Sequence, residues 1–167
     1  MELTTARMRG EPLGPRHLAD LAPMFADPRV AATMGGILTE EQVAAMLEQD
    51  AAHWERDGFG PWMCYDKETG EPVGRGGLNR TEFDGAAEVE VAWLITPERW
   101  KQGLATELGA ASVEVAFGTA GLADVVAFTL PDNLASRRVM EKLGFEYEKT
   151  APYKVYGDHV LYRLRAS

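Results

Sequence analysis

The spacing of apolar residues predicts a long amphipathic helix in the first third of the chain. Between Thr39 and Gly58, apolar side chains recur at helical spacing, which places them on one face of a helix. Thr39 is followed three residues later by Gln42, the pattern of a capping box. The residues on the expected core face are Val43, Met46, Leu47, Ala51 and Trp54.

From Pro61 the apolar period changes to two, which is typical of β-strands. Turn sequences at 67–71 and at Asp84-Gly85 separate successive runs, so we expect three strands in an antiparallel meander. The runs are Trp62–Tyr65, Val73–Leu78 and Ala87–Ile95.

A helix and a strand should follow the meander. Helix formers begin near Gly103 and Gly121 supplies a stop, after which the run Ala123–Leu130 is β-branched and aromatic enough to form a strand. Because a helix crosses over between them, this strand should lie parallel to the one that ends at Ile95.

The chain ends with another helix and two more strands. The helix begins at Asn133, a good N-cap residue, and stops at Gly144. The runs Phe145–Lys149 and Val160–Leu164 predict an antiparallel pair.

Shorter elements precede the long helix. We expect a strand over Leu3–Met8 that Gly10 and Pro12 break, and a helical run from His17 that Pro28 ends. The order of elements predicts a mixed α/β sheet, and the absence of repeats and linkers predicts a single domain over residues 1–167.

Composition narrows the function classes. A net charge of −9 argues against a nucleic-acid binder, because phosphate backbones favour clustered lysine and arginine. No apolar run approaches the length of a membrane span and the first residues lack a signal-peptide core, so we expect a cytoplasmic protein. The one cysteine, Cys64, excludes an intramolecular disulfide, and the three scattered histidines show no metal spacing.

The stretch Thr96–Glu107 joins a predicted strand to a predicted helix through a turn that contains glycine. A helix that starts this way leaves several backbone N–H groups unpaired and pointing in one direction. Such an end attracts anions, and phosphates above all.

Four segments together resemble the GNAT superfamily of acetyl-CoA-dependent N-acetyltransferases, and most of all its ribosomal-protein N-terminal acetyltransferase branch. They are Pro97-Glu98-Arg99-Trp100 with Gly103-Leu104-Ala105-Thr106-Glu107; Asp132-Asn133 through Glu141-Lys142-Leu143-Gly144-Phe145; Gly58-Phe59-Gly60-Pro61-Trp62; and Val160-Leu161-Tyr162-Arg163-Leu164. The resemblance implies a mostly antiparallel sheet of about seven strands, with one splayed parallel pair and about four flanking helices.

The resemblance implies acetyl-CoA as co-substrate. The backbone from Gln102 to Thr106, which includes Gly103, Leu104 and Ala105, would hold the pyrophosphate, and Lys101 brings a favourable charge beside it. The pantetheine arm would pair with free backbone groups of Leu94, Ile95 and Thr96, and Asn133 would offer it a side-chain amide.

The resemblance also implies the catalytic residues. Glu90 stands where a family glutamate acts as general base, and Glu88 is the alternative because it shares that face of the strand. Ser136 would protonate the departing thiolate, with Tyr147 or Tyr153 as alternatives. Cys64 has no paired histidine, so we expect direct transfer and no acyl-enzyme.

The implied partner is a primary amine, either a small molecule or a protein N-terminus, and the enzyme would be a monomer or homodimer that binds neither nucleic acid nor membrane. A non-catalytic acetyl-CoA-binding regulatory module is the alternative, and only Glu90 and Ser136 separate the two in the sequence. A nucleotide-binding enzyme is a third possibility, but no Gly-Lys-Ser/Thr follows the loop.

Overall fold

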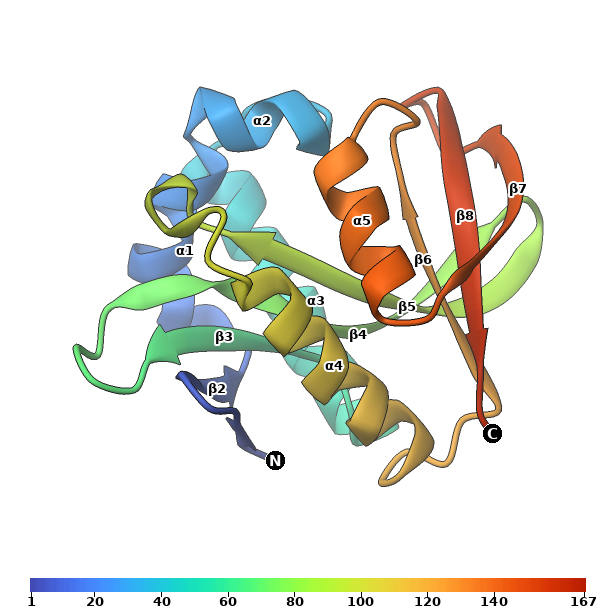
Figure 1. The fold of residues 1–167 in the computed structure, drawn as a ribbon. Coiled ribbons are helices and arrows are strands. Elements are labelled where there is room, and N and C mark those ends of the chain that lie inside the picture. The colour runs from blue at the N-terminus through green and yellow to red at the C-terminus, as the bar shows by residue number, and fades with distance from the viewer.

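The computed structural model describes residues 1–167 and contains an eight-stranded sheet with helices on both of its faces (Figure 1). The strands are β1 (Leu3–Thr4), β2 (Met8–Pro12), β3 (Pro61–Asp66), β4 (Pro72–Phe83), β5 (Ala86–Ile95), β6 (Asp124–Thr129), β7 (Glu146–Pro152) and β8 (Asp158–Arg165). The helices are α1 (Leu18–Phe25), α2 (Pro28–Met34), α3 (Glu40–Asp57), α4 (Leu104–Phe117) and α5 (Leu134–Lys142), with 3₁₀ turns at Pro15–His17 and Pro97–Arg99.

The strand order is β1-β2-β3-β4-β5-β6-β8-β7. Every neighbouring pair is antiparallel except β5 and β6, which are parallel. The predicted meander, the parallel crossover through α4 and the antiparallel pair at the end of the chain are therefore confirmed.

The first strand differs from its prediction. Thr5 N–H donates to Met8 O over 2.9 Å, which turns the chain and divides the expected strand into β1 and β2. Gly10 and Pro12 do not break β2; they pair with Cys64 and Trp62 of β3. This turn accounts for eight strands in place of about seven.

A fifth helix, α2, was not expected. Pro28 was predicted only to end a helix, whereas it also occupies the first turn of α2, where its missing N–H costs no hydrogen bond. The Asp27 carboxylate caps α2 by accepting from Arg29 N–H over 2.9 Å.

The capping box of α3 is confirmed, because Thr39 and Gln42 each accept the other's backbone N–H. Helix α4 ends at Phe117, earlier than the predicted stop at Gly121.

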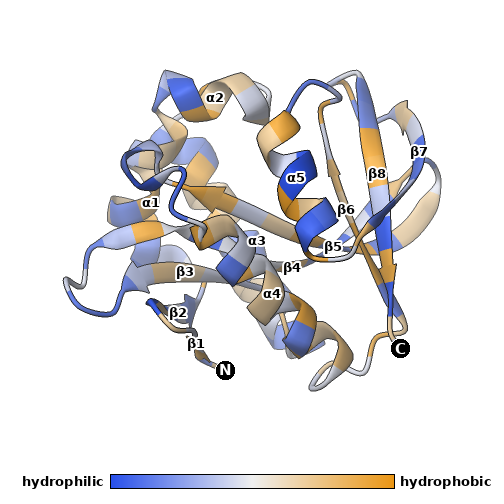
Figure 2. Ribbon diagram, viewed as in Figure 1, coloured by the Kyte–Doolittle hydropathy of each residue, from blue (hydrophilic) through white to orange (hydrophobic).

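The two faces of the sheet carry different helices. Leu21 of α1 and Leu47 of α3 pack against Met63 of β3, whereas Leu104 and Leu108 of α4 pack against the opposite face. Helix α5 continues the α4 side, where Met140 joins the core around β6 and β8. The turn between β3 and β4 and the loop before α4 are hydrophilic (Figure 2).

Strands β5 and β6 meet at one point and then diverge toward their carboxyl ends (Figure 1). Their ladder contains a single residue pair, Glu90 with Val126. Beyond that pair, β5 continues for five residues to Ile95 without a ladder partner on β6. The splayed parallel pair that the family resemblance implies is thus present.

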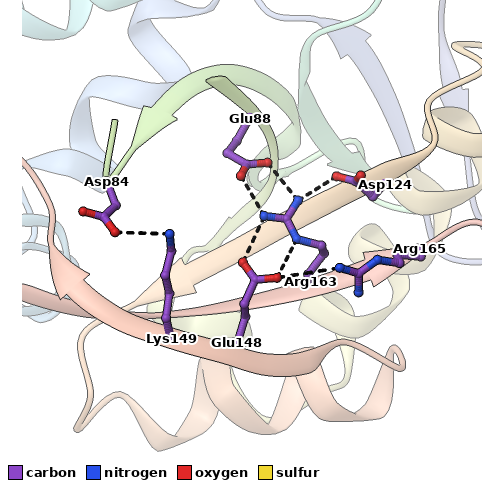
Figure 3. A network of polar contacts seen from close by, with 7 residues as sticks. All are labelled: Asp84, Glu88, Asp124, Glu148, Lys149, Arg163 and Arg165. Atoms are coloured by element: carbon purple, nitrogen blue, oxygen red, sulfur yellow. Dashed lines mark hydrogen bonds and ion pairs between the residues drawn. The ribbon is translucent and has the colours of Figure 1, made fainter. Parts of the chain in front are cut away.

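A network of ion pairs centred on Arg163 of β8 lies on the other side of the Glu90–Val126 pair, before β5 and β6 separate (Figure 3). The Arg163 guanidinium donates to Glu88 of β5, Asp124 of β6 and Glu148 of β7 over 2.7–3.0 Å. Glu88 and Asp124 each precede the single ladder pair by two residues. Arg163 therefore ties β5 and β6 together just before they separate.

Replacing Arg163 with Met should lower the free energy of unfolding by about 3–5 kcal/mol, because the largely buried Glu88 carboxylate would lose its cation. Arg165→Met is the matched control: Arg165 lies 3.9 Å from Glu148 with its side chain 70% exposed, so we expect a change below about 1 kcal/mol. Urea unfolding at pH 7 measures both values. Equal destabilisation by the two substitutions would contradict the role given to Arg163.

Candidate active site

A cleft with a volume of about 620 Å³ lies where β5 and β6 part. One wall is formed by α2, α3 and β4, and another by α5 and the end of β6. Because α3 and α5 cover opposite faces of the sheet, the cleft reaches from one face to the other through the gap between the strands. Such a passage allows two substrates to approach one point from opposite sides.

Four of the predicted site residues line this cleft: Glu90, Leu94, Asn133 and Ser136. The other eight lie outside it, at the end of β5 and in the loop and first turn of α4: Ile95, Thr96, Lys101, Gln102, Gly103, Leu104, Ala105 and Thr106. The predicted site residues therefore form two groups: the four that line the cleft are the cleft group, and the eight near the start of α4 are the loop group.

Glu90 is the predicted base, and its environment sets it apart from other carboxylates. Its carboxylate has no hydrogen-bond or ion-pair partner in the chain and lines the cleft, at the residue that forms the ladder pair with Val126. Loss of solvent raises the pKa of Glu90 to about 7, although the positive charges of Arg75 and Lys154 act in the opposite direction. A carboxylate with this pKa can accept a proton near neutral pH.

Glu88, the alternative base, is engaged elsewhere. Both of its oxygens accept hydrogen bonds from Arg163, over 2.7 and 3.0 Å, and it does not line the cleft. The geometry therefore favours Glu90.

Asn133 and Ser136 belong to one capping interaction at the start of α5. Asn133 Oδ1 accepts from Ser136 N–H over 3.3 Å, and Asn133 Nδ2 donates to Thr129 over 2.9 Å. The Asn133 amide is thus held in place with one Nδ2 hydrogen still free. Of the alternative acids, Tyr153 lines the cleft, whereas the Tyr147 hydroxyl bonds Thr150 outside it.

The loop before α4 presents unpaired donors, as predicted from its sequence. Gly103 has φ of +79° and precedes the helix, and the first α4 N–H bonded to backbone is that of Glu107, which donates to Gly103 O. The N–H groups of Leu104, Ala105 and Thr106 therefore have no backbone acceptor. Lys101 has φ of +63°, which costs a non-glycine residue about 1–2 kcal/mol.

Residues near the N-terminus hold this loop in place, a role that the sequence did not reveal. Arg7 donates from its guanidinium to Gln102 O over 2.8 Å and to Glu107 over 2.8 Å. Thr5 donates to the same Glu107 carboxylate over 2.6 Å. The contacts join segments about one hundred positions apart, so no local pattern indicates them.

Part of the predicted pairing surface on β5 is already used by the chain. Thr96 N–H donates to Val73 O over 2.8 Å, and Ile95 O accepts from the Trp100 indole over 2.7 Å. These two groups are not free for a ligand, and the register with β4 directs the backbone groups of Leu94 toward Arg75. The expectation of free backbone groups at Leu94, Ile95 and Thr96 is corrected to this extent.

Cys64, His17 and His53 have structural surroundings, whereas His159 lines the cleft and donates from Nδ1 to Gly157 O over 3.0 Å. Cys64 is fully buried in β3, and burial raises the pKa of its thiol to about 12, so it is a poor nucleophile. His17 and His53 hydrogen-bond backbone groups inside the fold. No cluster of three or more potential metal ligands is found, and no helix combines the length and the apolarity that a bilayer crossing requires.

Comparison with known proteins identifies the family. Residues 7–146 match the family described as Acetyltransferase (GNAT) domain. The chain belongs to the GNAT acetyltransferases. It is accordingly an acyltransferase that uses acetyl-CoA as co-substrate.

Three proteins serve as examples of what the chain is similar to. A putative GNAT-family acetyltransferase from Bordetella pertussis has a TM-score of 0.87 and 26% identity, with 99% of each chain covered. The FsC-acetyl coenzyme A-N(2)-transacetylase of Aspergillus fumigatus is 32% identical over 89% of this chain and 66% of its own length. A ribosomal L7/L12 α-N-protein acetyltransferase in complex with coenzyme A has a TM-score of 0.82 over 99% of this chain and 98% of its own, but at 15% identity it shows the fold alone.

The charged residues of the cleft that were not predicted are Asp50, Arg75, Arg80 and Lys154, and the first two form a pair. Asp50 of α3 and Arg75 of β4 face each other with 3.6 Å between Oδ2 and the guanidinium nitrogen. Asp50 lies at core spacing after Leu47 on α3, so an acidic residue on a predicted apolar face was the available signal. Arg75 lies within the glycine-rich run of β4, and no local sequence pattern indicates that its side chain lines a cleft.

Replacing Glu90 with Gln should stabilise the acetyltransferase at pH 8. The native pKa of about 7 lies above the usual value of 4.5, so the folded state binds more protons between these pH values and wild-type stability falls as pH rises through this window. The substitution removes that loss, and we expect a gain of about 1–3 kcal/mol at pH 8 that disappears below about pH 4.5. Urea unfolding at pH 4 and pH 8 measures it; no pH-dependent difference between the two proteins would contradict the raised pKa.

Proposed function

We propose that this acetyltransferase transfers acetyl directly to a primary amine in a ternary complex, with Glu90 as the general base. The observation that carries the proposal is a carboxylate in the cleft that no cation of the chain binds and whose pKa is raised to about 7. An acceptor ammonium must lose a proton before its nitrogen can attack, because an alkyl ammonium has a pKa near 10 in water. Glu90 is suited to accept that proton at neutral pH.

The cofactor half of the proposal rests on the loop before α4 and on α5. The unpaired N–H groups of Leu104, Ala105 and Thr106 would bind the pyrophosphate, with Gly103 leaving space for close approach. The pantetheine arm would lie along β5 near Leu94, and the free Nδ2 hydrogen of Asn133 would donate to it. The acceptor would then enter from the α2–α3 side.

Bound acetyl-CoA supplies an acetyl group that is activated as a thioester. Glu90 takes one proton from the acceptor ammonium and later releases it to solvent. The acceptor nitrogen forms the new C–N bond as the C–S bond breaks, and the second proton of the nitrogen passes to the sulfur. We assign Ser136 to deliver that proton through its hydroxyl, because it lines the cleft one turn into α5.

Two classes of acceptor fit this site. The family resemblance favours a protein N-terminus of the kind that the ribosomal-protein branch modifies, and a small primary amine is the other candidate. Both present an amine of the same chemistry to Glu90. A panel of free amines and short peptides separates them.

Glu90→Gln should lower kcat/KM for the best amine by about 10²–10⁴-fold at pH 7 and far less at pH 9, where the amine loses its proton to solvent. Acetyl-CoA affinity should stay unchanged, since Glu90 does not belong to the loop group. Release of free CoA with varied amine and pH measures the rates, and Glu82→Gln, an exposed glutamate on β4, is the control.

An unchanged rate at pH 7 in Glu90→Gln would contradict the role of Glu90. Tight acetyl-CoA binding without amine-dependent CoA release across the whole panel would contradict the proposed function and favour a non-catalytic binding module.

A further inference from the structure

Two buried polar atoms on the acceptor side of the cleft have no partner. They are Asp50 Oδ2 and Arg75 Nε, the two buried side-chain nitrogen or oxygen atoms in the chain that lack a hydrogen bond. Asp50 is 7% exposed and Arg75 is 8% exposed, and both line the cleft. In folded proteins most buried polar atoms have a hydrogen-bond partner, so two atoms without one in the same cleft are unusual.

The ion pair between these residues does not satisfy them. The 3.6 Å between Arg75 Nη2 and Asp50 Oδ2 is an ion-pair distance but too long for a hydrogen bond. Burial also raises the pKa of Asp50, against the attraction of Arg75. In the free protein both atoms are therefore buried without a hydrogen bond, and a group that bonds both of them would remove that cost.

The charges of the pair restrict which group can do so. A second ammonium would be drawn to Asp50 but repelled by the guanidinium at 3.6 Å, and a carboxylate would meet the opposite conflict. A neutral group with a donor and an acceptor side by side suits both: it donates to Asp50 Oδ2 and accepts from Arg75 Nε. A hydroxyl and a primary carboxamide have this chemistry.

The pair faces the same space as the proposed base. Arg75 pairs with Leu94 in the ladder of β4 and β5, and Asn79 pairs with Glu90. Because side chains alternate across a strand, Arg75 and Glu90 project from one face of the sheet, the face that α3 covers. An acceptor can therefore contact the pair with one end while its amine reaches Glu90.

We propose that Asp50 and Arg75 select acceptors that carry a neutral hydroxyl or carboxamide group some distance from the reacting amine, such as amino alcohols or peptides that begin with Ser or Asn. The inference rests on the proposed function and deepens it, because it names the second group that the acceptor must present. It assigns no proton transfer to either residue.

The test compares isosteric amines of graded length. Each set, with two to six carbons, contains an amino alcohol, the alkylamine with methyl in place of hydroxyl, the diamine and the ω-amino acid; peptides beginning with Ser, Asn, Ala or Leu complete the panel. We expect the best hydroxyl or carboxamide member to exceed its methyl isostere in kcat/KM by at least about tenfold, since the isostere leaves both atoms unpaired. Diamines and ω-amino acids should fall below the amino alcohol of equal length.

The double variant Asp50→Leu, Arg75→Met should lose this preference and bring the ratio below about threefold. Arg56→Met, on the exposed side of α3 and outside the cleft, is the control and should keep the wild-type ratio. If the double variant fails to fold, the wild-type comparison of isosteres still decides the question.

The two proposals fail in different ways. Amine-dependent CoA release with equal rates for hydroxyl and methyl isosteres would overturn the selectivity and leave the proposed function intact; a water held between Asp50 and Arg75 would give that result. Higher rates for diamines would overturn it as well. No amine-dependent CoA release from any member of the panel would overturn the proposed function and the selectivity together.

Discussion

Two parallel strands that share one ladder pair and then separate determine the architecture of this acetyltransferase. Strands β5 and β6 meet at Glu90 and Val126 and part toward their carboxyl ends. A parallel pair inside a sheet normally continues its hydrogen bonds, so the separation leaves backbone groups to be satisfied by something else. The cleft, the ends of both strands and the start of α5 all lie on the open side of this point.

Side-chain contacts on both sides of the Glu90–Val126 pair stabilise the separation of β5 and β6. On the closed side, Arg163 bonds carboxylates from three neighbouring strands (Figure 3). On the open side, α4 packs against the sheet through Leu104 and Leu108, and Arg7 fixes the loop that leads into it. Glu90 lies between these two supports, at the single residue pair where the strands touch, and it is partly buried there, so loss of solvent raises its pKa.

Much of the fold follows from local patterns in the sequence, whereas the differences arise from longer-range or ambiguous signals. The capping box at Thr39, the meander and the crossover through α4 depend on spacing and turn residues, and all are confirmed. The sequence does not predict helix α2, because Asp27 and Pro28 lie at the junction of two consecutive helices and a proline there indicates only the end of the first.

The candidate site divides in the same way. Glu90, Leu94, Asn133 and Ser136 were predicted from motifs and come together in one cleft. Asp50 and Arg75 were not, because their pairing depends on how α3 docks on β4. Likewise, the sequence predicts free backbone groups at Thr96 because it does not reveal that Val73 O of β4 accepts the Thr96 N–H.

We infer that acetyl-CoA binds and reacts in the gap between β5 and β6, next to the loop before α4. Amide-resolved hydrogen exchange with and without coenzyme A tests this most directly. Bound coenzyme A should slow exchange of the N–H groups of residues 102–106 and of the part of β5 beyond Glu90, with little change in β1 and β2. Protection confined to other surfaces, with the loop and β5 unaffected, would contradict it.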